Sequence, residues 1–262
     1  MAKRSARRRA LEAELYAGEA ASDPKVTKLF PIEGGYRPEA ADRAPERTPR
    51  EDRDQRYVKN VQPRSEGQKR LMEAIDTHNL VMALGPAGTG KTYLAIAKAV
   101  EALETGRVGR IVLSRPAVEA GESIGFLPGD MEDKLAPYLR PLYDALHDRL
   151  NAKRLKVLMA EGLIEIAPVG YMRGRTLNNA FVVIDEAQNC TYTQLKMLLT
   201  RLGWHSTMVV TGDPNQTDLL PELSGLGGCA ERLDELDGVS VVRLDKQDIV
   251  RHALVADMLQ VL

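Results

Sequence analysis

Residues 85–92 read Gly85-Pro86-Ala87-Gly88-Thr89-Gly90-Lys91-Thr92 and fit the pattern G-x-x-x-x-G-K-[ST] at every fixed position. The three glycines let the backbone adopt positive φ and bend tightly, so that successive N–H groups converge on one anion. Lys91 adds a compact cation that reaches β- and γ-phosphate oxygens, and Thr92 offers a hydroxyl to Mg²⁺ at the start of the following helix. The stretch therefore predicts a binding site for a nucleoside triphosphate and Mg²⁺.

The sequence on both sides of this loop indicates alternating strands and helices. Leu80–Leu84 is a short apolar run typical of buried parallel strands, and Tyr93–Leu103 is rich in helix formers with an apolar face. A second strand is expected at Arg110–Val118. This order predicts an α/β fold with a mostly parallel central sheet flanked by helices. Because ligands gather at the carboxyl ends of such strands, Ser114 and Arg115 are expected at the working edge.

A second motif, Asn179–Gln188, joins an apolar strand to two carboxylates. Asp185 can hold the Mg²⁺ shell from the second side, and Glu186 can orient or deprotonate a water that faces the γ-phosphate. Asp-Glu pairs after strands also occur by chance, but the complete phosphate loop upstream favours the catalytic interpretation. The pair predicts hydrolysis rather than phosphoryl transfer to a metabolite.

Met208–Thr217 repeats this arrangement of a strand, a tight turn and polar side chains. Its Thr211, Asp213 and Gln216 are therefore candidates for sensing whether the γ-phosphate is present.

Gln68, upstream of the phosphate loop, leaves two interpretations open. It stands three residues after Ser65, which is the capping-box position of a helix expected at Lys69–His78. Its amide group also offers the donor and the acceptor that the N6 and N7 edge of adenine requires.

Further strands and helices are expected along the rest of the chain. Lys134–Leu150 has the spacing of a helix that is broken by Pro137 and Pro141. The other expected elements are a helix at Ala152–Glu161, a strand at Leu163–Ala167, a helix at Cys229–Leu236 after the glycine-rich turn Leu223–Gly228, a strand at Val239–Leu244 and an amphipathic helix at Asp248–Leu259. Arg251 in the last helix is either a surface salt-bridge partner or a charge donor to a phosphate.

The segment Pro168–Thr176 combines an aromatic residue, two glycines and two arginines, Arg173 and Arg175. This composition suits stacking on bases and pairing with phosphates, so the segment is a candidate for binding nucleic acid. A solvated loop would have the same composition, and the sequence leaves that alternative open.

Composition excludes several other classes of protein. The chain has 262 residues, 44% of them hydrophobic and 28% charged, which is ordinary for a water-soluble domain. No apolar run approaches the ~18 residues of a membrane helix, and no hydrophobic signal core is present, so we expect a cytoplasmic protein without a membrane partner. Cys190 and Cys229 lack the spacing of a zinc site or a disulfide framework.

The first part of the chain differs in composition from the rest. Positions 1–60 hold 14 basic and 11 acidic residues, net +3, which leaves 22 basic and 26 acidic residues, net −4, for positions 61–262. Residues 1–57 therefore read as a basic, low-complexity tail and linker without a folded core, and residues 58–262 as the folded domain. The basic cluster at positions 3–9 is either a solvated arm or a contact to phosphate backbones.

Several motifs together resemble the PhoH family of P-loop ATPases, namely Gly85–Thr92, Ser114–Val118, Gly121–Lys134, Arg173–Leu177, Asp185–Gln188, Gly212–Gln216 and Asp248–His252. The resemblance covers about residues 60–262. It implies a RecA-like P-loop NTPase core, similar to the first such domain of superfamily 1 helicases, that binds and hydrolyses ATP with Mg²⁺. It also implies Gln68 at adenine, Gln216 near the γ-phosphate, and nucleic acid at the regions of Ser114 and Arg173.

The resemblance also raises the question of a partner subunit. Helicases of that superfamily close two RecA-like domains over ATP, and this chain has length for one, so a homo-oligomeric ring such as a hexamer is expected. Arg251 would then face a phosphate of its own or a neighbouring subunit. Two functions compete: an ATPase stimulated by single-stranded RNA or DNA, with unwinding activity, and a nucleotide-switched interaction protein that hydrolyses ATP slowly.

Overall fold

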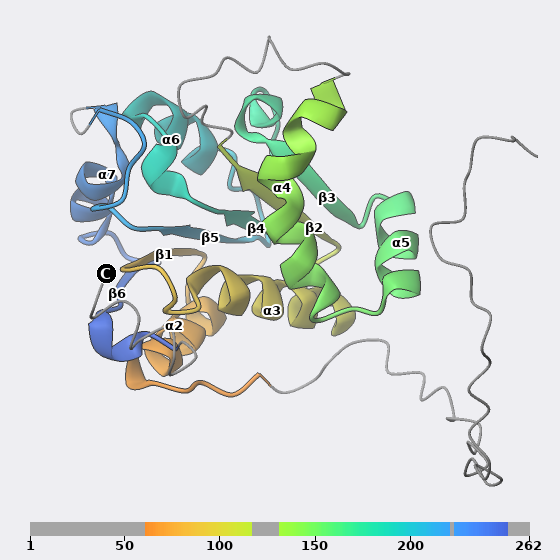
Figure 1. The fold of residues 1–262 in the computed structure, drawn as a ribbon, viewed down its shortest axis with the longest axis horizontal. Helices are drawn as coiled ribbons and strands as arrows, with labels where there is room; N and C mark the ends of the chain where they lie inside the picture. The colour runs from red at the N-terminus through yellow and green to blue at the C-terminus, as the bar shows by residue number, and fades with distance from the viewer. Residues whose placement is uncertain (1–60, 117–130, 221–222, 251–262) are drawn as a thin grey trace, which may run out of the picture. The chain divides into compact units, whose positions relative to one another are not determined.

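The computed structural model describes residues 61–116, 131–220 and 223–250 (Figure 1), with the backbone alone at 131–136. The predictions made for the tail at 1–57, for most of the motif at Gly121–Lys134, for Arg251 and for the rest of the last helix lie outside these residues. The helices and strands below are those of the described part of the chain.

The centre of the fold is a six-stranded sheet in which every described pair of neighbours is parallel. The order across the sheet is β3-β2-β4-β5-β1-β6. The strands are β1 (Leu80–Leu84), β2 (Arg110–Arg115), β3 (Ile164–Pro168), β4 (Ala180–Ile184), β5 (Thr207–Gly212) and β6 (Val239–Arg243). The chain leaves β1 and crosses two strands to reach β2, which creates a crevice at the carboxyl ends where ligands bind in open α/β sheets.

Helices cover both faces of this sheet, as Figure 1 shows. One apolar core joins the sheet to α2, α3, α4 and α5, and a second joins it to α6 and α7. The helices are α2 (Glu66–Thr77), α3 (Lys91–Glu104), α4 (Met131–His147), α5 (Ala152–Ala160), α6 (Tyr192–Leu199) and α7 (Leu226–Leu233). None of these described helices has the length and apolarity needed to cross a membrane. The α/β architecture predicted from the sequence is confirmed.

Alternation of side chains along the strand explains why β1 is apolar throughout. In β1, Val81 and Ala83 belong to the first core, whereas Leu80, Met82 and Leu84 belong to the second. Successive side chains of a strand point to opposite faces, so a strand covered on both sides needs a continuous apolar run.

Helix α4 differs from its prediction because it continues through both prolines. Pro137 and Pro141 lie inside the helix and are exposed. Their spacing of four places them on one face, while Leu142 and Leu146 are fully buried on the other. Because both prolines lie on the exposed face, water can reach that face and donate to carbonyl groups that proline leaves without a helical partner.

One other helix was not predicted, and two other elements differ from their predictions. Helix α6 was not predicted, although Thr191 forms a complete capping box at its start with Gln194. Helix α7 begins at Leu226 and includes two glycines that were expected in a turn. Asp248 ends a short 3-10 helix, η5 (Lys246–Asp248), and Ile249 is extended, so no α-helix begins at Asp248.

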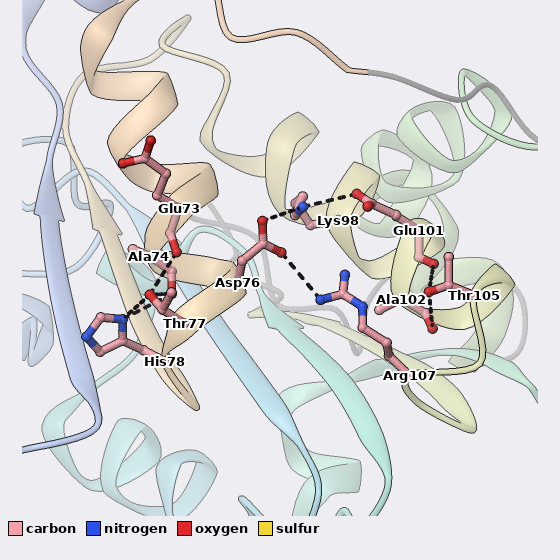
Figure 2. A network of polar contacts seen from close by, with 10 residues as sticks. All are labelled: Glu73, Ala74, Asp76, Thr77, His78, Lys98, Glu101, Ala102, Thr105 and Arg107. Atoms are coloured by element: carbon pink, nitrogen blue, oxygen red, sulfur yellow. Dashed lines mark hydrogen bonds and ion pairs between the residues drawn. The ribbon is translucent and has the colours of Figure 1, made fainter.

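A polar network ties the second half of α2 to α3 (Figure 2). The ammonium group of Lys98 pairs with Asp76 at 2.7 Å and with Glu101 at 3.1 Å, and Arg107 reaches Asp76 at 3.4 Å. The Lys98 side chain is 7% exposed, and a charge removed from water is tolerated when it is paired in this way. The network fixes the helix that follows the phosphate loop against the helix that precedes it.

Candidate functional site

The phosphate loop leaves β1 in the crevice at the carboxyl edge of the sheet. Gly85, Gly88 and Gly90 have φ values of 143°, 86° and 84°, which side chains rarely adopt. At Gly85 a Cβ atom would also lie 2.4 Å from the carbonyl oxygen of Leu244. Gly90 is the N-cap of α3 in a left-handed conformation. The loop therefore has the backbone that a phosphate cradle requires, with the helix N-terminus directly behind it.

Lys91 lies within the loop that precedes it. Its ammonium group donates hydrogen bonds to the carbonyl oxygens of Gly85 at 2.6 Å and Pro86 at 2.8 Å. The residue is 9% exposed. Burial lowers the pKa of Lys91 below its ordinary value, and the nearby carboxylates of Asp213, Glu186 and Asp185 oppose this effect. The predicted phosphate ligand is thus a largely desolvated cation at the mouth of the cradle.

Thr92 and Asp185 bring oxygen atoms of the two main motifs together. The Thr92 hydroxyl donates to Oδ1 of Asp185 at 2.6 Å, and the Thr211 hydroxyl donates to the same oxygen at 2.7 Å. Asp185 is 2% exposed. The side chains of Thr92, Asp185 and Thr211 offer oxygen atoms, which are the metal ligands that Mg²⁺ prefers. The set therefore fits a Mg²⁺ ion that takes its remaining ligands from phosphates and water. Among the described residues, no cluster of three or more His, Cys, Asp or Glu could hold a metal ion by itself.

Glu186 follows in an unusual backbone conformation. Its φ of 52° and ψ of 42° are left-handed, which is costly for a residue other than glycine and recurs at functional sites. Oε2 accepts a hydrogen bond of 2.5 Å from Nε2 of Gln188, and Oε1 lies 3.7 Å from the Arg115 guanidinium. The carboxylate is thereby oriented by two neighbours.

A cavity of ≈ 300 Å³ joins these groups. Its walls are the phosphate loop, the end of β4 and the end of β5, and its lining residues are Ala87, Gly88, Gly90, Lys91, Thr92, Tyr93, Asp185, Glu186, Gln188, Thr211, Gly212, Asp213 and Gln216. The buried side chain of Gln188 connects two of these walls, because its Oε1 accepts from the N–H of Asp213 at 3.1 Å. Gln216 and Asp213, predicted as γ-phosphate sensors, both line this cavity.

Gln68 lies beside a second cavity of ≈ 670 Å³ that adjoins the loop at Gly88 and Gly90. Ser65 caps α2 as predicted, because its hydroxyl accepts from the N–H of Gln68. The Gln68 side chain does not complete the capping box: Oε1 accepts from the N–H of Arg64 at 2.8 Å, and Nε2 donates to the carbonyl of Thr89 at 3.0 Å. Both ends of its amide group therefore have partners within the protein. Its role at adenine stays a prediction.

Ser114 and Arg115 lie at the end of β2, beside the phosphate site. The contact with nucleic acid that the resemblance implies for this region stays a prediction. Ser114 is completely buried, and the carbonyl of Ser114 accepts from the N–H of Asp185. The Arg115 guanidinium lies 3.4 Å from Oδ2 of Asp185 as well as 3.7 Å from Glu186. Strand β2 ends next to β4, so the backbone carbonyl of Ser114 and the guanidinium of Arg115 both contact residues at the end of β4.

The two other candidates for binding nucleic acid, Arg173 and Arg175, differ in whether their side chains are free to contact a ligand. Arg175 is held by Glu165 through two hydrogen bonds of 2.6 Å, so its guanidinium is engaged within the protein. Arg173 is exposed, and Tyr171 nearby is 62% exposed on the 3-10 helix η2 (Val169–Met172). Of the two arginines, Arg173 is the one that is exposed next to an exposed aromatic ring.

The sheet, the phosphate loop and the carboxylates at the end of β4 define a P-loop NTPase fold. The model of the PhoH-like protein family matches residues 60–262, and the chain belongs to this family. A PhoH-like protein of Bacillus subtilis (strain 168) is 55% identical over 203 residues, which cover 77% of this chain and 64% of the relative. Protein PhoH of Escherichia coli (strain K12) is 47% identical over 205 residues, which cover 77% and 58%. The chain thus spans about three fifths of the length of these relatives.

A solved structure has a similar fold. The large terminase from a thermophilic bacteriophage aligns with a TM-score of 0.50 over 76% of this chain and 50% of the terminase. The two sequences are 13% identical, so the likeness is one of fold alone.

Two residues of the site region were missed by sequence reasoning. Arg149 follows α4, is 3% exposed and lines the second cavity, and no local motif marks it. Asp248 was predicted only as the start of the last helix and of the Asp248–His252 motif, yet its carboxylate accepts from the N–H groups of Gly67 and Asp245. A sequence signal for that contact does exist, since Gly67 leaves room for a neighbour where any other residue would place a side chain.

Proposed function

We propose that this chain is a Mg²⁺-dependent ATPase whose turnover is stimulated by single-stranded RNA. The observation that carries the proposal is the meeting of Thr92, Asp185 and Glu186 at one cavity beside the phosphate loop. A hydroxyl, a buried carboxylate and a second carboxylate in a left-handed conformation supply the groups that a hydrolase needs and that a passive nucleotide binder does not.

Several residues of the cavity have separate roles in this reaction. The loop amides and Lys91 bind the phosphates, and Thr92 and Asp185 would hold Mg²⁺. When bound, Mg²⁺ neutralises charge on the phosphate oxygens and orients them. Glu186 accepts the proton of the attacking water, and Gln188 holds its carboxylate in place. Gln216 stands at the rim as the γ-phosphate sensor.

The nucleic-acid part of the proposal is supported by Tyr171 and Arg173. Both lie after β3, at the same carboxyl edge of the sheet as the phosphate site. An exposed ring stacks on bases of any sequence, and an arginine pairs with phosphates. We extend the proposal to a cytoplasmic homo-oligomeric ring that completes its ATP sites between subunits and unwinds paired strands.

The test is ATP turnover by the full chain at low salt, with and without single-stranded RNA. Stimulation is expected in the wild type, and Tyr171→Ala with Arg173→Ala is expected to abolish stimulation while leaving basal turnover unchanged. Trp204→Ala is the matched control, because Trp204 is 81% exposed but precedes β5 at the opposite edge of the sheet. Equal stimulation in the double variant would contradict this assignment.

A second candidate function is a nucleotide-switched interaction protein with slow hydrolysis. The contacts of Glu186 favour it, because both carboxylate oxygens already face Gln188 or Arg115 and an engaged base is less available to water. Slow basal turnover without stimulation by RNA would support this function over the first.

A further inference from the structure

Two consecutive carbonyl groups of the phosphate loop are held from outside the loop. The carbonyl of Gly88 accepts a hydrogen bond of 3.0 Å from the backbone N–H of Val250. The carbonyl of Thr89 accepts one of 3.0 Å from Nε2 of Gln68. In a trans peptide the C=O and N–H groups point in opposite directions, and the described residues contain no cis peptide. The N–H groups of Thr89 and Gly90 therefore point away from these partners, which is the orientation that a phosphate cradle requires.

Asp248 joins the two segments that supply these partners. Its Oδ1 accepts from the N–H of Gly67 at 3.0 Å, next to Gln68 in α2. Its Oδ2 accepts from the N–H of Asp245 at 3.0 Å, which closes the turn that leads to Val250. Asp248 is 6% exposed, and a Cβ atom at Gly67 would lie 2.3 Å from its Oδ2. One buried carboxylate thus fixes both segments against each other.

The chemistry of Asp248 suits this task. Burial alone would raise the pKa of Asp248, but hydrogen bonds outweigh burial and hold the pKa below its ordinary value; the donors are the Ser65 hydroxyl and the N–H groups of Asp245 and Gly67. The charge of Arg70 acts in the same direction. Without the carboxylate, buried backbone donors would lose their acceptor, which is costly enough to displace the segments.

We propose that Asp248 is a positioning residue for nucleotide binding, a role that rests on the ATPase function proposed above. It holds the start of α2 and the turn before Val250 so that Gln68 and Val250 align two peptide groups of the loop. Asp248 touches no phosphate itself. By thermodynamic reciprocity, a nucleotide that binds the aligned loop stabilises the Val250 contact in return.

The test measures the affinity of the full chain for ADP with Mg²⁺ by a fluorescent ADP analogue, alongside the melting temperature without nucleotide. Asp248→Asn and Val250→Pro are each expected to raise the Kd for ADP about tenfold or more, the effect of one lost buried hydrogen bond. Proline at 250 removes the N–H, and the extended Ile249 before it accommodates proline. Hydrogen exchange of the Val250 amide is expected to slow when ADP binds.

Two matched controls separate positioning from general destabilisation. Val250→Ala keeps the N–H, and Asp76→Asn weakens the ion pairs of the same helix at the network shown in Figure 2. Asp76→Asn is expected to keep the Kd within about twofold of wild type, although it lowers the melting temperature. Val250→Ala is expected to bind ADP at least about fivefold more tightly than Val250→Pro, because only the proline removes the N–H. Equal ADP affinity in Val250→Pro and Val250→Ala would overturn the proposal, including when Asp248→Asn fails to fold. A wild-type chain that does not bind ADP would overturn the proposed ATPase function, and this inference with it.

Discussion

The hydroxyl of Thr92 donates a 2.6 Å hydrogen bond to Oδ1 of Asp185, although the two residues are 93 positions apart. The contact arises because β4 and β1 flank the same strand, β5, and all three end at one edge of the sheet. Thr211 at the end of β5 donates to the same oxygen. Three strands therefore converge on one carboxylate, which makes Asp185 the junction between the phosphate loop and Glu186.

Lys91→Ala is expected to abolish tight nucleotide binding. The variant removes a desolvated cation that lies within the loop, and charge-assisted contacts to phosphate are among the strongest in proteins. We expect the Kd for ATP with Mg²⁺ to rise about 100-fold or more. Lys69→Ala is the matched control, because Lys69 is exposed and its partner Glu66 lies at 3.7 Å. Isothermal titration calorimetry checks both, and ATP binding by Lys91→Ala at wild-type affinity would refute the role of Lys91.

The Glu165–Arg175 pair is expected to make stability depend on pH. Its hydrogen bonds from Arg175 hold the pKa of Glu165 below its ordinary value of 4.5, against the effect of burial. A carboxylate with a lowered pKa adds stability above its unfolded-state pKa, and that stability is lost as pH falls through the folded-state pKa. Glu165→Gln should therefore cost about 0.5–1 kcal/mol at pH 7, a modest value because both side chains are partly exposed.

The difference between Glu165→Gln and wild type should then shrink as urea unfolding is repeated at pH values below 4.5. Asp234→Asn provides a comparison, since its bond to Arg243 is single and more exposed, so a smaller cost is expected at pH 7. A gap between Glu165→Gln and wild type that stays constant down to acid pH would show that the carboxylate contributes through packing alone.

The strands and the phosphate loop could be predicted because local sequence determines them. The continuous apolar run Leu80–Leu84 predicts a strand that is buried on both faces, as observed. The glycines of Gly85–Thr92 predict the positive φ angles that the loop adopts. The contacts of Arg115 could not be predicted, because they depend on which strand lies beside β2. Asp248 was misplaced for the same reason: apolar periodicity suggested a helix, whereas a tertiary contact with Gly67 fixes a 3-10 turn.

Arg251 is expected to act on a phosphate of its own subunit or of a neighbouring subunit. The residue lies outside the described part of the chain, but Val250 immediately before it contacts the phosphate loop at Gly88. An arginine supplied in trans accelerates phosphoryl transfer by ~10³–10⁵. If Arg251 acts in trans, mixing Arg251→Ala with Lys91→Ala subunits, each inactive alone, should restore part of the turnover, because some interfaces would pair an intact loop with an intact arginine. Full subunit exchange without recovery would exclude a role in trans.

The most direct test of the ATPase assignment is the turnover of ATP by Glu186→Gln beside the wild type, with the affinity for ATP and Mg²⁺ measured on the same preparations. Glutamine keeps the size of the side chain and removes its capacity to accept a proton. We predict that ATP affinity stays within about threefold while turnover falls at least about 100-fold. Turnover in Glu186→Gln equal to that of the wild type, or a wild type that binds ATP and never hydrolyses it, would contradict the account.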